Sequence, residues 1–338
     1  MRIGNNPSRD QQLYENYFTH QVIIPVFIPN FDDYYKDSLA VLEICLNSLL
    51  KTSHSQTLIT VVNNGSCEKV IDYLNELFFQ KKIHEIYHTQ NIGKLNAILK
   101  GLVGSNIELV TISDADVLFL DNWQTETLTV FNSFPKAGVV GIVPQFRTFE
   151  YMCGNLILKN LFSKKMQFSK VKNTDGLKSF YKSIGWGEDY NSDYLKQILT
   201  IKNKETTAVV GSGHFVATYK RGIFKEIKTY LEYKLGGDSE RYLDEILLKY
   251  GLWRLTTYGN FAYHMGNVYE EWMDETMSSI KEEKVDVVGL INKQTIRTES
   301  NLLFYIANVL FIKLFNKRRY RQIFYKFKRL PKQMIQKY

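Results

Sequence analysis

The first 120 residues alternate between short aliphatic, β-branched runs and longer stretches with Leu or Ile at three- and four-residue spacing. The runs have the length of strands, and the spacing is typical of helices with one buried face. Such alternation predicts an α/β fold with a mixed, mainly parallel sheet flanked by helices. The expected strands are 22–27, 58–62, 83–88 and 109–112, and the expected helices contain 39–50, 67–79 and 95–102.

The second half has a weaker pattern. Lys, Ser, Asn and Tyr dominate residues 147–206, which we expect to form an irregular insertion. Regular elements are expected again after it, with strands at 208–219 and 253–258 and helices at 221–230 and 239–250.

The net charge of +8 is concentrated at the C-terminus. Residues 300–338 hold ten Lys or Arg and no Asp or Glu, so the remaining 299 residues sum to 8 − 10 = −2. The apolar run 302–315 is shorter than the roughly 20 residues that span a bilayer. The segment 317–329 then interleaves cations with aromatics. This C-terminal tail is predicted to be a helical, basic extension that lies on an anionic membrane surface. A helix packed on the body is the alternative. Nucleic acid is the least favoured partner.

Cysteine content and the N-terminus bear on location. Cys45, Cys67 and Cys153 lie far apart without metal-ligand spacing, which favours a reducing compartment over a disulfide framework. The first twenty residues lack the apolar stretch of a signal peptide. We expect a cytoplasmic protein, peripheral on the inner face of the membrane if the tail binds lipid.

Two polar turns follow predicted strands. Asp114 and Asp116 come directly after the strand 109–112 and precede another apolar run, 117–120. Carboxylates between buried runs are costly unless they are paired or used, and an Asp-x-Asp turn can hold a divalent cation. The turn 63–66 follows the strand 58–62. Ligands of open α/β sheets bind beyond the carboxyl ends of strands, so both turns are expected at one site.

Four segments together resemble the family 2 glycosyltransferases of the GT-A fold, a Rossmann-like fold of the nucleotide-diphospho-sugar transferases. The segments are 22–26, 61–66, 91–97 and 113–116, which match in order a first-strand Ile-Ile-Pro-Val, a Val-Asp-Asp-Gly-Ser turn, an Asn-x-Gly-Lys segment and an Asp-x-Asp. The resemblance covers about 20–145 and continues more loosely to about 270.

The resemblance implies a metal-dependent, inverting transfer of a sugar from a nucleotide-diphosphate donor to a hydroxyl acceptor. The acceptor would be a glycan or lipid-linked glycan, and bacterial surface polysaccharide assembly is the implied setting. Residues 1–270 would form the catalytic domain, with 20–145 binding the nucleotide sugar and 146–270 lying on the acceptor side. Residues 271–338 would be the C-terminal extension.

The family pattern also implies roles for donor-binding residues. Pro25 and Val26 would lie at the nucleotide edge, Asn63 would face the base, Lys94 would approach the diphosphate, and Asp114 would contact the ribose. The family has Asp where this chain has Asn63 and Asn64. An Asn carbonyl can still accept from uracil N3–H, so UDP is the favoured donor nucleotide.

Asp116 would bind the metal, Mn²⁺ or Mg²⁺, and His264 after the strand 253–258 would complete its coordination. The resemblance implies a carboxylate base, for which Asp238 is our choice, although Asp also suits a helix N-cap at this position. Glu188 and Asp189 of the 185–189 turn are the alternatives, since a similar Trp-Gly-Glu-Asp turn carries the base in other GT-A enzymes.

Two other functions compete with glycosyl transfer. Sugar-phosphate nucleotidyltransferases share the α/β architecture, but they carry a glycine-rich loop after the first strand, and residues 25–29 contain no glycine. A non-catalytic sugar- or membrane-binding protein could also keep the fold.

Overall fold

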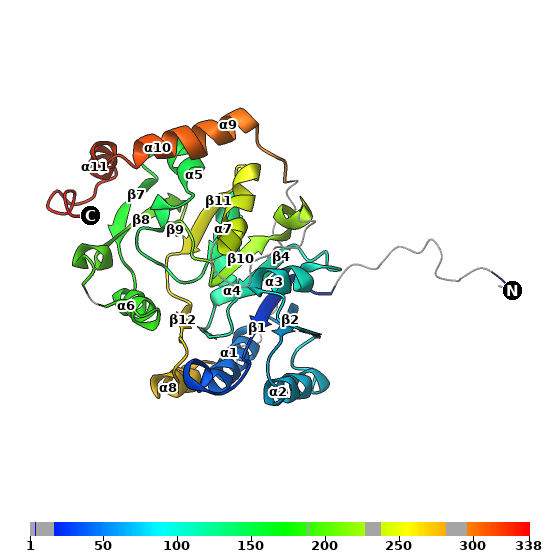
Figure 1. The fold of residues 1–338 in the computed structure, drawn as a ribbon. Coiled ribbons are helices and arrows are strands. Elements are labelled where there is room, and N and C mark those ends of the chain that lie inside the picture. The colour runs from blue at the N-terminus through cyan, green and yellow to red at the C-terminus, as the bar shows by residue number, and fades with distance from the viewer. Residues whose placement is uncertain (1–3, 5–16, 188, 227–237, 282–295) are drawn as a thin grey trace.

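The computed structural model describes residues 4, 17–187, 189–226, 238–281 and 296–338, without the side chains of 226 and 238–240. A ten-stranded mixed sheet crosses the molecule, in the order β3-β2-β1-β4-β10-β6-β11-β9-β8-β7 (Figure 1). Its strands are β1 (His20–Val26), β2 (Thr57–Asn64), β3 (Glu85–Thr89), β4 (Leu109–Ser113), β6 (Ala137–Gly141), β7 (Met166–Lys170), β8 (Gln197–Asn203), β9 (Thr206–Val210), β10 (Val216–Lys220) and β11 (Trp253–Thr257).

The predicted mixed, mainly parallel sheet is confirmed. The strands β1, β2, β3 and β4 pair in parallel, as do β6 and β11. The antiparallel strands β10, β9 and β7 run against the other seven. A separate two-stranded sheet joins β5 (Val117–Phe119) to β12 (Ala262–His264).

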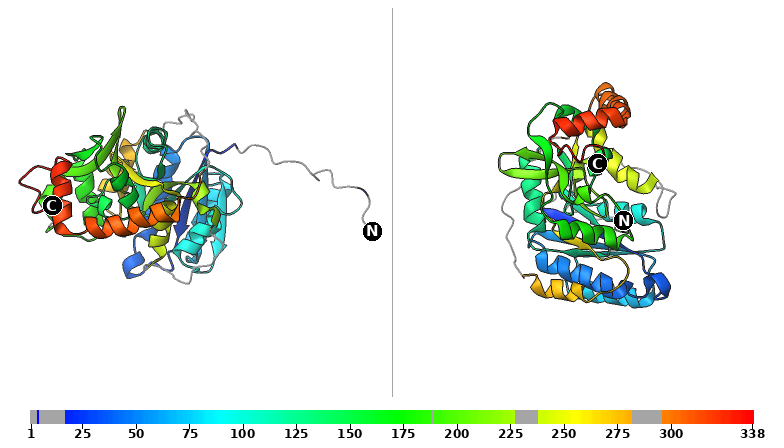
Figure 2. Two further views of the ribbon diagram at one scale, coloured as in Figure 1. Left: turned by 90° about the horizontal axis from the view of Figure 1, so that it is seen from above. Right: turned by 90° about the vertical axis from the view of Figure 1, so that its left-hand side faces the viewer.

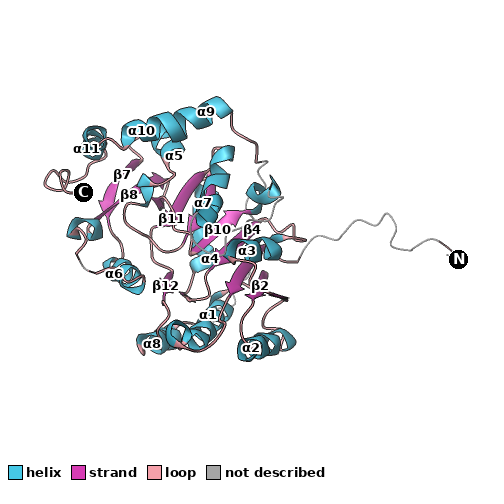
Figure 3. Ribbon diagram, in the orientation of Figure 1, coloured by secondary structure: helices cyan, strands magenta, loops and turns pink. Residues whose placement is uncertain are grey.

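Helices cover both faces of the sheet (Figure 3). They are α1 (Ser38–Thr52), α2 (Glu68–Phe79), α3 (Lys94–Leu102), α4 (Trp123–Ser133), α5 (Gly154–Lys159), α6 (Thr174–Ser183), α7 (Asp238–Glu245), α8 (Trp272–Ser279), α9 (Asn301–Tyr305), α10 (Phe311–Phe315) and α11 (Arg318–Phe327). Short 3-10 segments are η1 (Asp33–Tyr35), η2 (Thr148–Glu150), η3 (Ser192–Leu195), η4 (Arg221–Glu226) and η5 (Ile246–Tyr250), and η6 (Ile306–Leu310) is a π-helical turn.

Side chains alternate between the two faces of each central strand. Val22 and Ile24 of β1 join the core that contains the buried residues of α1, whereas Ile23 joins a second core with α3. Because both faces are covered, β1 reads as a continuous apolar run.

A buried polar network ties the sheet to α4. His20 Nδ1 accepts from Gln124 Nε2 at 2.9 Å, and His20 Nε2 lies 2.7 Å from Thr111 Oγ1. Thr111 in turn bonds Thr218 at 2.7 Å, so β1, β4, β10 and α4 are linked. Burial lowers the pKa of His20 to about 3, which keeps the imidazole neutral at physiological pH.

The structure corrects several expected elements. Residues 208–219 form two strands, β9 and β10, because the chain turns at Gly211, where φ is +101° and a Cβ would meet the backbone of Thr148. Residues 147–206 are not irregular: they form α5, β7, α6 and β8. Their polar composition hid apolar residues, among them Phe168 and Phe180, that reach the core.

Two expected helices also differ. In the described part of 221–230 the chain forms only the 3-10 segment η4, and 239–250 divides into α7 and the 3-10 segment η5. The elements β12 and α8 were not anticipated.

The C-terminal segment is helical, as predicted, and lies at the end of the molecule opposite to α1, α2 and α8 (Figures 1 and 2). Phe315, Phe324 and Tyr325 are buried in the core cluster that also contains residues of β1. Among the described residues, no helix combines the length and apolarity required to cross a membrane.

Candidate active site

A cavity of about 240 Å³ opens at the carboxyl ends of β1, β2 and β4. Predicted donor-binding and metal residues line it: Pro25, Val26, Lys94, Asp114 and Asp116. The expectation that the polar turns after parallel strands share one edge therefore agrees with the geometry.

Asp114 forms an ion pair within this cavity. Its Oδ1 lies 2.6 Å from Lys94 Nζ, and both side chains keep about a fifth of their surface exposed, at 23% and 22%. Lys94 is the first residue of α3, so its cation projects beside the exposed amides of a helix N-terminus. Cation and amides together favour an anionic ligand such as a phosphate.

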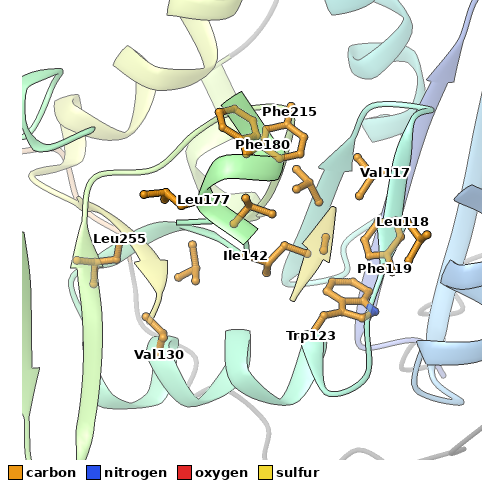
Figure 4. Packing of buried hydrophobic residues seen from close by; sticks show 14 of the residues in the cluster. Val117, Leu118, Phe119, Trp123, Val130, Ile142, Leu177, Phe180, Phe215 and Leu255 are labelled. Carbon is orange, nitrogen blue, oxygen red and sulfur yellow. The ribbon is translucent and has the colours of Figure 1, made fainter. Parts of the chain in front are cut away.

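Asp116 sits between two buried strands. The next three residues, 117–119, form the buried strand β5, and Figure 4 shows Phe119 packed beside Trp123. The Asp116 backbone carbonyl accepts from Met265 N at 2.8 Å, which fixes the turn against the chain after β12. Asp114 N donates to the Phe215 carbonyl at 2.7 Å, so backbone hydrogen bonds hold the turn at both of its Asp residues.

The two oxygens of the Asp116 carboxylate have different surroundings. Oδ1 is buried without a hydrogen-bond partner among the described residues, and Oδ2 lies 3.5 Å from His264 Nε2. Burial raises the pKa of Asp116; His264 opposes this rise, and Asp114 adds to it. A carboxylate destabilised in this way gains from a bound cation.

The hydrogen bonds of His264 determine which nitrogen faces Asp116. Ser183 Oγ donates to the Phe180 carbonyl at 2.7 Å, so at 3.0 Å it can only accept from His264 Nδ1–H. In the neutral imidazole, the lone pair is then on Nε2. In that neutral state, two electron-pair donors face each other across 3.5 Å. A hydrogen bond from the other ring nitrogen, as here to Ser183, is typical of metal-binding histidines.

The donor set fits a divalent cation but does not complete its coordination. Within the described ranges, no group of three or more His, Cys, Asp or Glu side chains is arranged to hold a metal ion. Asp116 and His264 would supply two ligands, and a phosphate-bearing ligand in the cavity would have to supply others.

Residues 25–186 match the model of glycosyl transferase family 2. This segment is a family 2 glycosyltransferase domain. The match confirms the resemblance of the strand and turn motifs, and the protein is a glycosyltransferase. No curated protein sequence matches the chain significantly.

Solved structures that the chain matches include S. aureus TarS and GalNAc-T7. Residues 1–349 of S. aureus TarS superpose with a TM-score of 0.44 at 11% identity, over 77% of this chain and 69% of that chain. The complex of the same TarS fragment with UDP-GlcNAc gives 0.44 at 13% identity, over 92% and 71%. GalNAc-T7 with UDP, GalNAc and Mn²⁺ gives 0.46 at 12% identity, over 74% and 44%.

Asn63 and Asn64 of this glycosyltransferase have different surroundings. Asn63 is buried: Oδ1 accepts from Ser66 N at 2.9 Å, and Nδ2 lies 3.0 Å from His88 Nδ1. Asn64 lines the cavity, and its Oδ1 accepts from Ile92 N at 2.9 Å. The structure therefore brings Asn64, and not Asn63, to the cavity wall.

Sequence reasoning missed other parts of the cavity wall. Phe27 and Tyr34, at 37% and 65% exposure, line it after β1, together with Asn267. Asn267 Nδ2 donates to the Tyr34 backbone carbonyl at 2.9 Å, which joins the loop after β1 to the loop after β12. Aromatic residues directly after the first strand were the available signal, because that strand ends at the predicted site.

The candidate bases are only partly described. Glu188 lies outside the described residues, and so does the side chain of Asp238, the first residue of α7. Asp189 is exposed in the turn after α6. Since Ser183 at the end of α6 bonds His264, this turn begins close to the Asp116–His264 pair.

The turn 63–66 depends on a glycine. Gly65 has φ +94°, and a Cβ there would lie 2.8 Å from Asn91 N; Gly104 has φ +84°, but a Cβ there would meet nothing within 4 Å. Gly104→Ala should cost about 1–2 kcal/mol for the left-handed backbone. Gly65→Ala should lose at least about 1 kcal/mol more, because the chain around Asn91 must move. Urea unfolding of both variants tests this; equal losses would contradict the proposed contact.

Proposed function

We propose that the protein is a metal-dependent, inverting glycosyltransferase that uses a UDP-sugar and a hydroxyl acceptor on a glycan or lipid-linked glycan. The observation that carries the metal is the pair of facing donors, Asp116 Oδ2 and His264 Nε2, 3.5 Å apart beside the cavity. The Lys94 cation and the Asp114 carboxylate at the same cavity support a ligand that carries both an anionic group and hydroxyl groups.

Asp116 and His264 would hold Mn²⁺ or Mg²⁺. When bound, the cation supplies charge neutralisation for the departing nucleoside diphosphate. The unpartnered Asp116 Oδ1 and the His264 tautomer that Ser183 selects support this assignment.

The remaining cavity residues would bind and orient the donor. Asp114 would accept hydrogen bonds from the ribose hydroxyls, and Lys94 would turn from Asp114 toward the diphosphate. Pro25 and Val26 would form the nucleotide edge. We transfer the base contact expected of Asn63 to Asn64, because Asn63 uses its amide to close the turn. Tyr34 offers a ring for stacking on the base.

We propose Asp238 as the general base, with Glu188 and Asp189 as alternatives. The base takes the acceptor proton while the acceptor oxygen bonds to the anomeric carbon and the bond to the diphosphate oxygen breaks. Attack on the face opposite the leaving group inverts the anomeric configuration. The order of elements supports Asp238, which begins a helix after β10, whereas the 185–189 turn precedes β10. The 185–189 turn stays an alternative because it begins close to His264.

We also propose that the reaction takes place at an anionic membrane surface in bacterial surface polysaccharide assembly. The eight exposed Lys and Arg of the C-terminal segment support the membrane setting: 313, 317, 318, 319, 326, 329, 332 and 337.

The metal assignment predicts that Asp116→Asn abolishes metal-dependent UDP binding, because the amide loses the charge that holds the cation. Calorimetry with UDP, in the presence of Mn²⁺ and of EDTA, measures the effect. Asp72→Asn on the exposed face of α2 removes one charge elsewhere and should bind as the unmodified protein does. Unchanged Mn²⁺-dependent affinity in Asp116→Asn would refute the assignment.

The base assignment predicts that Asp238→Asn lowers turnover by about 10²-fold or more, with donor affinity nearly unchanged. A base acts on the acceptor proton and need not contact the nucleotide. Glu188→Gln and Asp189→Asn should lower turnover less. Near-normal turnover of Asp238→Asn, with loss of activity in either of the other variants, would move the base to the 185–189 turn.

A further inference from the structure

The helical segment 301–315 exposes a row of apolar side chains. We call it the outer face and define it as Leu302, Leu303, Ile306, Val309, Leu310 and Leu314, which are 39–66% exposed. The elements α9, η6 and α10 follow one another without a break, so the face extends for about 18 Å at the usual rise per residue. Figure 1 shows this helix along the edge of the molecule.

The opposite side of the same helix is fixed to the body. Ala307 and Phe315 are buried, and a Cβ on Gly154 would lie 2.4 Å from the Ala307 carbonyl oxygen. Such a close backbone approach of α5 leaves no freedom for the helix to rotate its outer face inward. The outer face therefore stays on the surface of the molecule.

The helix α11, which contains much of the basic and aromatic sequence, is bonded to the body through its side chains. Glu150 lies 3.1 Å from Arg321 Nη1 and accepts from Tyr325 Oη at 3.1 Å. Lys328 Nζ donates to the carbonyls of Asn160 and Ser163 at 2.9 Å. Its buried aromatics, Phe324 and Tyr325, belong to the core, so this part of the 317–329 segment is packed on the body, as in the alternative expected for the tail.

The charges around the outer face indicate which kind of partner fits it. Arg321 and Lys328 have internal partners, and the other eight of the ten cations are exposed, Arg329 with one surface hydrogen bond to Gln167. Residues 300–338 contain no Asp or Glu. A second copy of the chain, related by a two-fold axis, would bring two groups of exposed cations together, and these would repel each other. An anionic bilayer accepts both an apolar face and its cations.

We infer that the outer face of α9–α10 inserts into the headgroup region of an anionic bilayer, while exposed cations beside it, such as Lys317, Arg318 and Arg319, contact lipid phosphates. This inference rests on the membrane setting of the proposed function and names the surface that makes the contact. Catalysis by the cavity residues is not required for it.

Sedimentation of the full chain with phosphatidylcholine vesicles, with and without phosphatidylglycerol, tests the inference. At about 50 mM salt the protein should bind only the anionic vesicles. Leu310→Ser combined with Leu314→Ser should weaken binding about tenfold or more, since two apolar side chains leave the interface. The control, Phe79→Ser, removes an exposed ring on α2 at the opposite end and should bind normally.

Neutralising Lys317, Arg318 and Arg319 to Gln should also weaken anionic binding, and more salt should weaken the binding of the unmodified protein. Three results would overturn the inference: no binding by the unmodified protein, unchanged binding by the double Leu variant, or a dimer in solution that this variant dissociates without any vesicle binding. Hydrolysis of UDP-sugars, measured on the same samples, separates a failure of the proposed catalysis from a failure of the membrane surface.

Discussion

The site depends on the Asp116 carboxylate, one oxygen of which the fold buries without a hydrogen-bond partner among the described residues. Asp116 lies between β4 and β5, and backbone hydrogen bonds at both Asp residues of the turn hold it where Oδ1 is sealed from solvent. An anion in such a place is costly unless a cation or proton compensates it. His264 faces it from β12 with the nitrogen that Ser183 leaves unprotonated in the neutral ring. This polar constraint is the main support for the proposed metal site.

The parallel half of the sheet gathers the other functional groups around this carboxylate. The strands β1, β2 and β4 end at one edge, so the last residue of β2, Asn64, and the loops after β1 and β4, with Tyr34 and Asp114, line one cavity. The buried network of His20 and Thr111 holds β1 and β4 in register behind it. The family 2 match covers these loops, and the C-terminal helices add a separate surface at the far end of the molecule.

The sequence predicted the first half well because its elements are bounded by sharp changes of period. The common position of Asp114, Asp116 and Lys94 was predictable, since each follows a clear strand or begins a clear helix. Asn63 was assigned to the base although its amide closes the turn, since pattern alone does not say which of two adjacent amides points inward. Residues 147–206 looked irregular because their core residues are scattered among polar ones. The role of Ser183 depends on a contact 81 residues away, which no local pattern reveals.

The most direct test is a crystal structure of the protein grown with UDP and Mn²⁺, with anomalous data collected at the manganese edge. The account predicts one strong peak within bonding distance of both an Asp116 oxygen and His264 Nε2, about 2.2 Å, with diphosphate oxygens completing the shell. Lys94 should then have left Asp114. Clear density for UDP in the cavity without an anomalous peak at Asp116 would contradict the account, as would a peak whose ligands include neither residue.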